Sequence, residues 1–250
     1  MDVLLTNDDG IRAGGLRALY AALLAAGHTV NVVAPITEQS AVGHAITFLN
    51  PIRADEIVED GFSGIGCTGT PADCVKLGLS TLLKHQPDIV LSGINKGANV
   101  GVDIVYSGTV SAATEGALMG VHAMAVSVDD FMPGDLSEQA AYAVELMERI
   151  PWAELPDRTV MNCNFPRGPL AEAGPLVLCP HTRAAYEDWY LTREDPRGRP
   201  YYWLQGEIPE GRISPGKDRA LLTEGHVTLT PLRIDFTCPE AMRTLERRGF

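Results

Sequence analysis

The chain has 250 residues, which suits one large domain or one domain with an appendage and disfavours a fusion of two enzymes. Hydrophobic residues make up 45% and charged residues 21%, a balance that allows a folded core and excludes a disordered chain. The net charge of -12 disfavours nucleic acid and anionic membrane surfaces as partners. A phosphorylated small-molecule substrate would need local charge compensation, for which a divalent cation is the simplest source.

The N-terminus has no basic segment ahead of an apolar stretch, so no secretory signal is expected. The longest uncharged run, residues 18–37, is interrupted by Gly27, His28 and Pro35, which predicts a helix, a turn and a strand in place of a membrane span. Five dispersed cysteines without a C-x-x-C pair favour free thiols over a disulfide framework or a zinc site. We therefore expect a cytoplasmic protein.

Short apolar strands alternate with helices along the first 150 residues. In chain order we expect strands over 3–5, 30–34, 88–92 and 123–128, and helices over 15–26, 72–83, 111–120 and about 135–150. Thr70 and Pro71 supply an N-cap and a first helical residue for the second helix. Asp135 with Glu138 predicts a capping box for the last one. The alternation predicts an α/β fold with a doubly wound, mostly parallel, Rossmann-like sheet.

The residues after 150 are less regular. Strands are expected over 159–165, 176–179 and 227–232, and a terminal helix over 239–248. Between them lies a segment with little periodicity that nevertheless carries Tyr186, Trp189, Tyr190, Tyr201, Tyr202 and Trp203. An extended arm or hairpin that packs on a neighbouring subunit would explain both features, and a hairpin folded on its own subunit is the alternative. The predicted organisation is a catalytic domain over 1–180, an arm for oligomer contact over 181–225, and a C-terminal strand and helix over 226–250.

Two adjacent carboxylates, Asp8 and Asp9, directly follow the first predicted strand. Gly10 allows the backbone to turn sharply there, at the strand end where open α/β sheets bind ligands. Adjacent carboxylates repel each other unless a cation or a shared proton relieves them, so the pair is a candidate site for a hard divalent ion. A solvated turn is the alternative, because Asn-Asp-Asp-Gly is also favourable turn sequence.

Polar residues also follow the second and third predicted strands. Ser40 lies a few residues past the second strand, and Asn95 follows the third. If these strands neighbour the first one, Ser40 and Asn95 converge with Asp8 and Asp9. All four offer oxygen atoms, the ligands that Mg²⁺, Mn²⁺ and Ca²⁺ prefer. The alternatives are a loop hydroxyl for Ser40 and a turn-forming amide for Asn95.

A third polar element, Ser107-Gly108-Thr109, leads into the helix expected over 111–120. Hydroxyls and free N–H groups at a helix N-terminus form an anion site suited to one phosphate, and a simple helix cap is the alternative. The triphosphate loop GxxxxGK[ST] and the dinucleotide fingerprint GxGxxG are missing, so an ATPase or a nicotinamide dehydrogenase would lack its expected parts.

Two basic side chains lie near these elements. His44 is four residues from Ser40 and is a candidate general acid, although most of the six histidines are expected to be structural. Lys96, beside Asn95, is a candidate phosphate neighbour, and a solvated charge is its alternative role.

Taken together, these motifs resemble the survival protein E (SurE) family of bacterial and archaeal nucleotidases. The resemblance rests on five blocks in the family's order, Leu4 to Ile11, Val33 to Pro35 with Gln39-Ser40, Gly69 to Val75, Ser92 to Asn95 with Gly97 to Asn99, and Tyr106 to Ser111, followed by Thr228 to Thr237 as a C-terminal signature. One block would be weak, whereas five ordered blocks are specific.

The resemblance implies a divalent-metal-dependent phosphomonoesterase acting on nucleoside 5′- and 3′-monophosphates, and often on short polyphosphate. It assigns metal ligation, one Mg²⁺ or Mn²⁺ per subunit, to Asp8, Asp9, Ser40 and Asn95. It assigns phosphate binding to Asn99, Ser107, Gly108 and Thr109, with Asp8 and Asp9 as the catalytic residues. It also implies exchange of a C-terminal arm between subunits, and hence a homodimer or homotetramer.

The expected mechanism is in-line attack on phosphorus by a metal-activated water, with Ser107, Thr109 and the helix N-terminus holding the phosphoryl oxygens. A rival mechanism forms an aspartyl phosphate, but its usual Asp-x-Asp signature differs from the adjacent Asp8-Asp9. Two other functions remain open. A nucleotide-sugar glycosyltransferase would need a second doubly wound half after residue 150, and a non-catalytic nucleotide-binding protein could keep the phosphate site without turnover.

Overall fold

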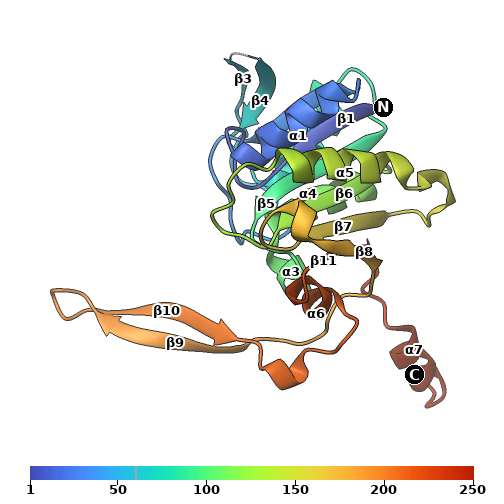
Figure 1. The fold of residues 1–250 in the computed structure, drawn as a ribbon. Helices are drawn as coiled ribbons and strands as arrows, with labels where there is room; N and C mark the ends of the chain where they lie inside the picture. The colour runs from blue at the N-terminus through green and yellow to red at the C-terminus, as the bar shows by residue number, and fades with distance from the viewer. Residues whose placement is uncertain (60) are drawn as a thin grey trace.

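A computed structural model describes residues 1–59 and 61–250 (Figure 1). Nine of the strands described form one sheet in the order β3-β4-β2-β1-β5-β6-β7-β11-β8. Their bounds are β1 Asp2–Thr6, β2 Thr29–Pro35, β3 Ala54–Glu59, β4 Phe62–Cys67, β5 Ile89–Lys96, β6 His122–Val128, β7 Thr159–Phe165, β8 Gly174–Leu178 and β11 His226–Arg233. The α-helices are α1 Gly14–Ala25, α2 Pro71–Leu77, α3 Asp103–Tyr106, α4 Gly108–Leu118, α5 Ser137–Arg149, α6 Asp218–Thr223 and α7 Pro239–Glu246. None of the helices described is long and apolar enough to cross a bilayer.

The six central strands, from β4 to β7, pair in parallel, and the edges add antiparallel pairs. β3 runs antiparallel to β4, and β11 runs antiparallel to β7 while pairing in parallel with β8. The predicted α/β, doubly wound, mostly parallel sheet is therefore confirmed. No second doubly wound unit follows residue 150 in the part of the chain that the structure describes, because β7, β8 and β11 all join the same sheet.

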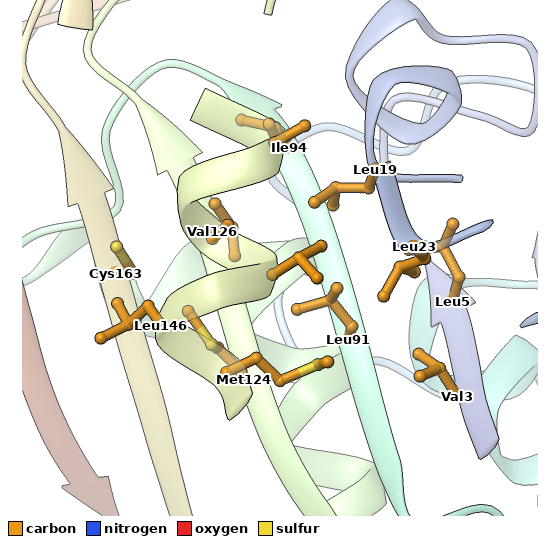
Figure 2. Close-up of a cluster of buried hydrophobic side chains, with 14 of the residues drawn as sticks. Val3, Leu5, Leu19, Leu23, Leu91, Ile94, Met124, Val126, Leu146 and Cys163 are labelled. Atoms are coloured by element: carbon orange, nitrogen blue, oxygen red, sulfur yellow. The ribbon is translucent and has the colours of Figure 1, made fainter. Parts of the chain in front are cut away.

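The sheet has a hydrophobic core on each face. One core packs beneath α1 and α5, where Leu19 and Leu23 of α1 meet Leu5, Leu91 and other strand residues (Figure 2). The opposite core lies beneath α2 and α4 and includes residues such as Val90 and Ala113. Strands buried on both faces read as continuous apolar runs, which is why the sequence pattern identified them.

Several helix boundaries differ from expectation. α2 ends at Leu77, six residues before the expected end, and a π-helical turn over Gly78–Leu82 follows it. α4 begins at Gly108, three residues before the expected start, and so takes in the Ser-Gly-Thr segment. α5 begins at Ser137, and its N-cap, Leu136, makes no side-chain cap. The predicted capping box is therefore wrong: the Asp135 carboxylate instead accepts hydrogen bonds from the main chain and hydroxyl of Ser137, a local turn that competes with the helix.

The segment expected to form an arm contains the two-stranded hairpin β9, Glu187–Glu194, and β10, Pro200–Glu207. The hairpin projects from the body of the molecule, and every residue in both strands is exposed (Figure 1). Pairing of Trp203 with Leu191 and of Gln205 with Trp189 sets its register. Because side chains alternate along a strand, Trp189, Leu191 and Trp203 share one face.

Candidate functional site

The suspected site residues meet at the carboxyl edge of the parallel strands. β1 pairs on one side with β2 and on the other with β5, so the loops that leave these three strands emerge next to one another. A cavity of about 310 Å³ lies there. It is lined by Asp8, Asp9, Glu38, Ser40, Ala41, Asn95, Lys96, Gly97, Ala98, Asn99, Asp103, Tyr106, Ser107 and Phe131. Six of the eight residues assigned to metal or phosphate binding thus line one cavity, and Lys96 lines it as well.

The other two, Gly108 and Thr109, lie behind the cavity wall in the first turn of α4. Thr109 is fully buried, and its hydroxyl donates a hydrogen bond to Oδ1 of Asp8. A Cβ atom on Gly108 would lie 2.7 Å from Cβ of Asp8, so a side chain there would collide with Asp8. The α4 N-terminus is therefore packed directly against Asp8, and the Thr109 hydroxyl is committed to that carboxylate.

Asp8 is 5% exposed, and its environment disfavours the charged form. The pKa of Asp8 is raised to about 6, chiefly by burial. The hydrogen bond from Thr109 lowers the pKa, and the negative charge of Asp9 raises it further. A carboxylate held this way is stabilised by any cation that enters the cavity.

Asp9 has a cationic partner in Lys96. Nζ of Lys96 lies 3.2 Å from Oδ1 of Asp9 and 3.9 Å from Oε2 of Glu38. Burial raises the pKa of Asp9 against the lowering effect of Lys96, and the hydrogen bond to Asp9 raises the pKa of Lys96. Lys96 thus compensates one of the two adjacent carboxylates and keeps a positive charge on the cavity wall.

Ser40 and Asn95 contribute neutral oxygen atoms. The Ser40 hydroxyl donates to Oε1 of Glu38 over 2.6 Å, which leaves the oxygen lone pairs for a ligand. Nδ2 of Asn95 donates to the carbonyl oxygen of Gly97 over 2.7 Å, so Oδ1 is the amide atom that remains for coordination. Each side chain is oriented by a hydrogen bond to a residue two positions away in the sequence.

Ser107 is the N-cap of α4, because its hydroxyl accepts a hydrogen bond from the N–H of Val110 over 3.0 Å. It also lines the cavity, so the capping and site roles are compatible. The cap orients the first turn of α4, whose N–H groups and dipole favour an anion at this position.

His44 does not line the cavity. Its Nε2 atom lies 2.8 Å from Oε2 of Glu115, a carboxylate on α4 that also accepts a 2.5 Å hydrogen bond from Lys76. These bonds join the loop that carries Ser40 to α4 and α2. His44 therefore anchors its loop to α4 through Glu115, and it does not line the cavity that holds Asp8 and Asp9.

Sequence reasoning missed three cavity residues: Glu38, Asp103 and Phe131. Glu38 sits two residues before Ser40, and its hydrogen bond with Ser40 could not be read from a loop without periodicity. Asp103 opens the short helix α3 and pairs with Arg219 from α6, a contact across more than a hundred residues. Phe131 is 80% exposed on the loop after β6, so no core pattern marked it.

The donor set fits a hard divalent cation. Two carboxylates, a hydroxyl oxygen and an amide oxygen are the ligand types that Mg²⁺ and Mn²⁺ prefer. Burial raises the pKa of both Asp8 and Asp9, so a positive charge beside them would favour their ionised forms. No cluster of three or more His, Cys, Asp or Glu side chains suited to a metal occurs in the residues described. A cation here would therefore rely on Ser40, Asn95 and water to complete its shell.

The fold and the cavity together define a Rossmann-like α/β protein with an acidic cavity at the carboxyl edge of its parallel strands. The family model described as Survival protein SurE matches residues 3–188, and the chain belongs to this family.

Close relatives cover almost the whole chain. Proteins named 5′-nucleotidase SurE from Maridesulfovibrio salexigens and Solidesulfovibrio magneticus are each 62% identical to this chain, over 99% of it and 98% and 97% of their own lengths. The crystal structure of the SurE protein from Aquifex aeolicus is 35% identical, covers 100% of both chains and has a TM-score of 0.85. The resemblance that the motifs indicated is confirmed.

Proposed function

We propose that this protein is a divalent-metal-dependent phosphomonoesterase that hydrolyses nucleoside 5′-monophosphates to nucleoside and phosphate. It is an enzyme of the nucleotidase class, as its curated relatives at 62% identity are 5′-nucleotidases over nearly the full chain. The observation that carries the metal proposal is the meeting of Asp8, Asp9, Ser40 and Asn95 in one cavity. Activity on 3′-monophosphates and short polyphosphate belongs to the same proposal, with the motif resemblance as its support.

The chain's own residues have distinct roles in this reaction. A bound divalent cation would polarise a phosphoryl oxygen and lower the pKa of a water molecule that attacks phosphorus. Asp8 and Asp9 supply its charged ligands, and Thr109 fixes the direction in which the Asp8 carboxylate points. Ser107 and the first N–H groups of α4 hold phosphoryl oxygens as negative charge develops on them. Lys96 adds a fixed positive charge at the cavity wall.

Phosphate release from AMP by metal-stripped protein, with and without added Mg²⁺ or Mn²⁺, tests the proposal. Metal-restored release is expected, and release by Asp8→Asn should fall by several orders of magnitude, about 10³-fold or more, because a charged ligand is lost. Asp135→Asn, a change on the exposed loop before α5, is the matched control and should retain activity. No release from any nucleotide under any cation would leave a nucleotide-binding protein without turnover, and near-normal Asp8→Asn would refute the ligand assignment.

We further propose that residues 181–225 form an arm that packs on a second copy of this chain, giving a homodimer or homotetramer. The support is the apolar content of the projecting hairpin, where Trp189, Trp203 and Leu204 are 50%, 59% and 58% exposed. Such a surface is costly to leave in water. The partner of the active site is a small nucleotide, and the net charge of -12 disfavours nucleic acid as a partner.

A further inference from the structure

Two buried asparagines on β7 lie outside every role described above. Asn162 and Asn164 are 0% exposed, and they alternate along the strand with Met161, Cys163 and Phe165, which pack in the core beneath α5. Asn162 and Asn164 lie on the opposite face of β7, the same face as Val160, which packs in the core beneath α2 and α4. Buried amides are unfavourable unless they make hydrogen bonds, so their partners indicate why the strand carries them.

Their common partner is the main chain of Asn99, a residue of the cavity wall. Oδ1 of Asn164 accepts from the N–H of Asn99 over 2.8 Å, and Nδ2 of Asn164 donates to the carbonyl oxygen of Asn99 over 3.3 Å. Nδ2 of Asn162 donates to the same carbonyl oxygen over 2.8 Å. Three hydrogen bonds from one strand therefore fix both main-chain polar groups of a single loop residue.

The side chain of Asn99 is fixed from the neighbouring strand. Its Nδ2 atom donates to Oγ of Ser127 on β6 over 2.8 Å. Ser127 stands in register with Asn164 on one side and with Asn95 on the other, and Asn164 stands in register with Thr228 of β11. A polar row thus crosses four adjacent strands beneath the Asn99 loop, and it ends at Asn95, which itself lines the cavity.

We propose that Asn162 and Asn164 are positioning residues, which hold the loop over 97–102 so that Asn99 presents its side chain to the phosphate of the substrate. This inference rests on the proposed function, because it takes the cavity as a phosphomonoester site. The environment of Asn162 indicates that a contribution to stability alone does not explain why β7 carries two asparagines. Its Oδ1 atom is buried without a hydrogen-bond partner among the residues described, a cost that an apolar residue of similar size would avoid.

The test replaces each amide and measures binding apart from turnover. Asn162→Leu and Asn164→Leu are compared with wild type for kcat and KM with AMP, and for protection against thermal unfolding by inorganic phosphate in the presence of Mn²⁺. Thr228→Val is the matched control, since Thr228 is fully buried beside Asn164 and its hydroxyl has no partner among the described residues.

We expect KM to rise about tenfold or more in the two Leu variants, with a smaller change in kcat and a loss of phosphate protection, because the lost hydrogen bonds act on ligand binding. For Asn162→Leu the thermal midpoint without ligand should stay close to that of wild type. Thr228→Val should leave KM and phosphate protection unchanged. Wild-type KM and protection in both Leu variants, or equal losses in Thr228→Val, would overturn the inference.

A second variant covers the case in which Asn164→Leu does not fold. In Asn164→Asp a protonated carboxyl reproduces the donor and acceptor of the amide, whereas the ionised form loses the donor to Asn99. The ratio of its KM to that of wild type should therefore rise with pH, and a ratio independent of pH contradicts the positioning role. If wild type binds phosphate but does not hydrolyse AMP, the proposed function fails while the positioning of Asn99 remains measurable through phosphate protection.

Discussion

The hydroxyl of Thr109, in the first turn of α4, donates a hydrogen bond to the carboxylate of Asp8 at the end of β1. The bond joins the helix N-terminus assigned to phosphate with the carboxylate assigned to the metal, so the two halves of the candidate site are held in one geometry. Thr109→Val keeps the shape of the side chain and removes the donor. Loss of a hydrogen bond to a charged group is expected to lower kcat/KM for AMP about 10- to 100-fold. Thr109→Ser should restore most of that loss, and equal activity of the Val and Ser variants would exclude the proposed orientation of Asp8.

Because Gly108 has no side chain, the N-terminus of α4 can lie directly against Asp8. A Cβ atom there would lie 2.7 Å from Cβ and 2.8 Å from Oδ2 of Asp8. Gly108→Ala should therefore displace the carboxylate and lower kcat/KM on the order of 10²-fold, the effect expected of a misplaced catalytic group. Gly14→Ala is the control, since no atom lies within 4 Å of the added Cβ. The measurement is kcat/KM for AMP in both variants. Wild-type kcat/KM in Gly108→Ala would show that catalysis does not require Asp8 in this position.

Glu115 ties the Ser40 loop to two helices, and this contact predicts a pH-dependent stability. Hydrogen bonds from His44 and Lys76 hold the pKa of Glu115 below its usual value of 4.5. Because the folded-state pKa is lowered, the ionised group stabilises the protein above pH 4.5, and this contribution is lost as the pH falls through the lowered value. Glu115→Gln should reduce the free energy of unfolding at neutral pH by about 1.5–3 kcal/mol.

Urea denaturation of Glu115→Gln and wild type at neutral pH and in acid measures this difference, which should shrink in acid. The exposed pair Glu145 and Arg149 supplies the control, because Glu145→Gln should change stability by less than about 1 kcal/mol. A deficit for Glu115→Gln that stays constant with pH would rule out an ionised Glu115 as its source.

The projecting hairpin predicts the size of the particle in solution. Trp189 and Trp203 share one face of the hairpin, so Trp189→Ser/Trp203→Ser removes both indole rings from that face. Light scattering at micromolar protein should find a dimer or tetramer for wild type and a smaller species for the double variant. Arg197→Ser at the hairpin turn is the control and should leave the mass unchanged. A monomeric wild-type protein would remove the basis for an arm between subunits.

Much of the sheet could be predicted from sequence, because the central strands are buried on both faces and therefore consist of consecutive apolar residues. The candidate site residues could be proposed because Asp8 and Asp9 closely follow one such strand and Asn95 lies near the carboxyl end of its neighbour, and the carboxyl ends of neighbouring parallel strands share an edge. A hairpin was one of the expectations for residues 181–225, but the bounds of β9 and β10 were not predicted, since their residues are exposed on both faces and carry no alternation of apolar and polar side chains. Strands β3 and β4 were not predicted either.

What could not be predicted depends on contacts between distant segments. One example is the ion pair between Asp103 and Arg219, and another is the hydrogen bond between Asn164 and Asn99. In each case the two residues lie on different elements, and each residue alone resembles an ordinary loop or strand residue. Thr109 was expected to hold phosphate, and its hydrogen bond to Asp8 became visible only in the folded structure, where the first turn of α4 lies against that carboxylate.

The polar row from Asn95 through Ser127 and Asn164 to Thr228 makes the candidate site sensitive to strand register. A slip of one residue between β6 and β7 would turn Asn164 toward the core beneath α5 and replace it beneath Asn99 with Cys163 or Phe165. The same slip would bury two amides among Met and Leu side chains, at a high cost in unpaired polar groups. Misregistered sheets are thus both unstable and unable to form the cavity wall, so the asparagines that hold the loop also select the correct pairing of the strands during folding.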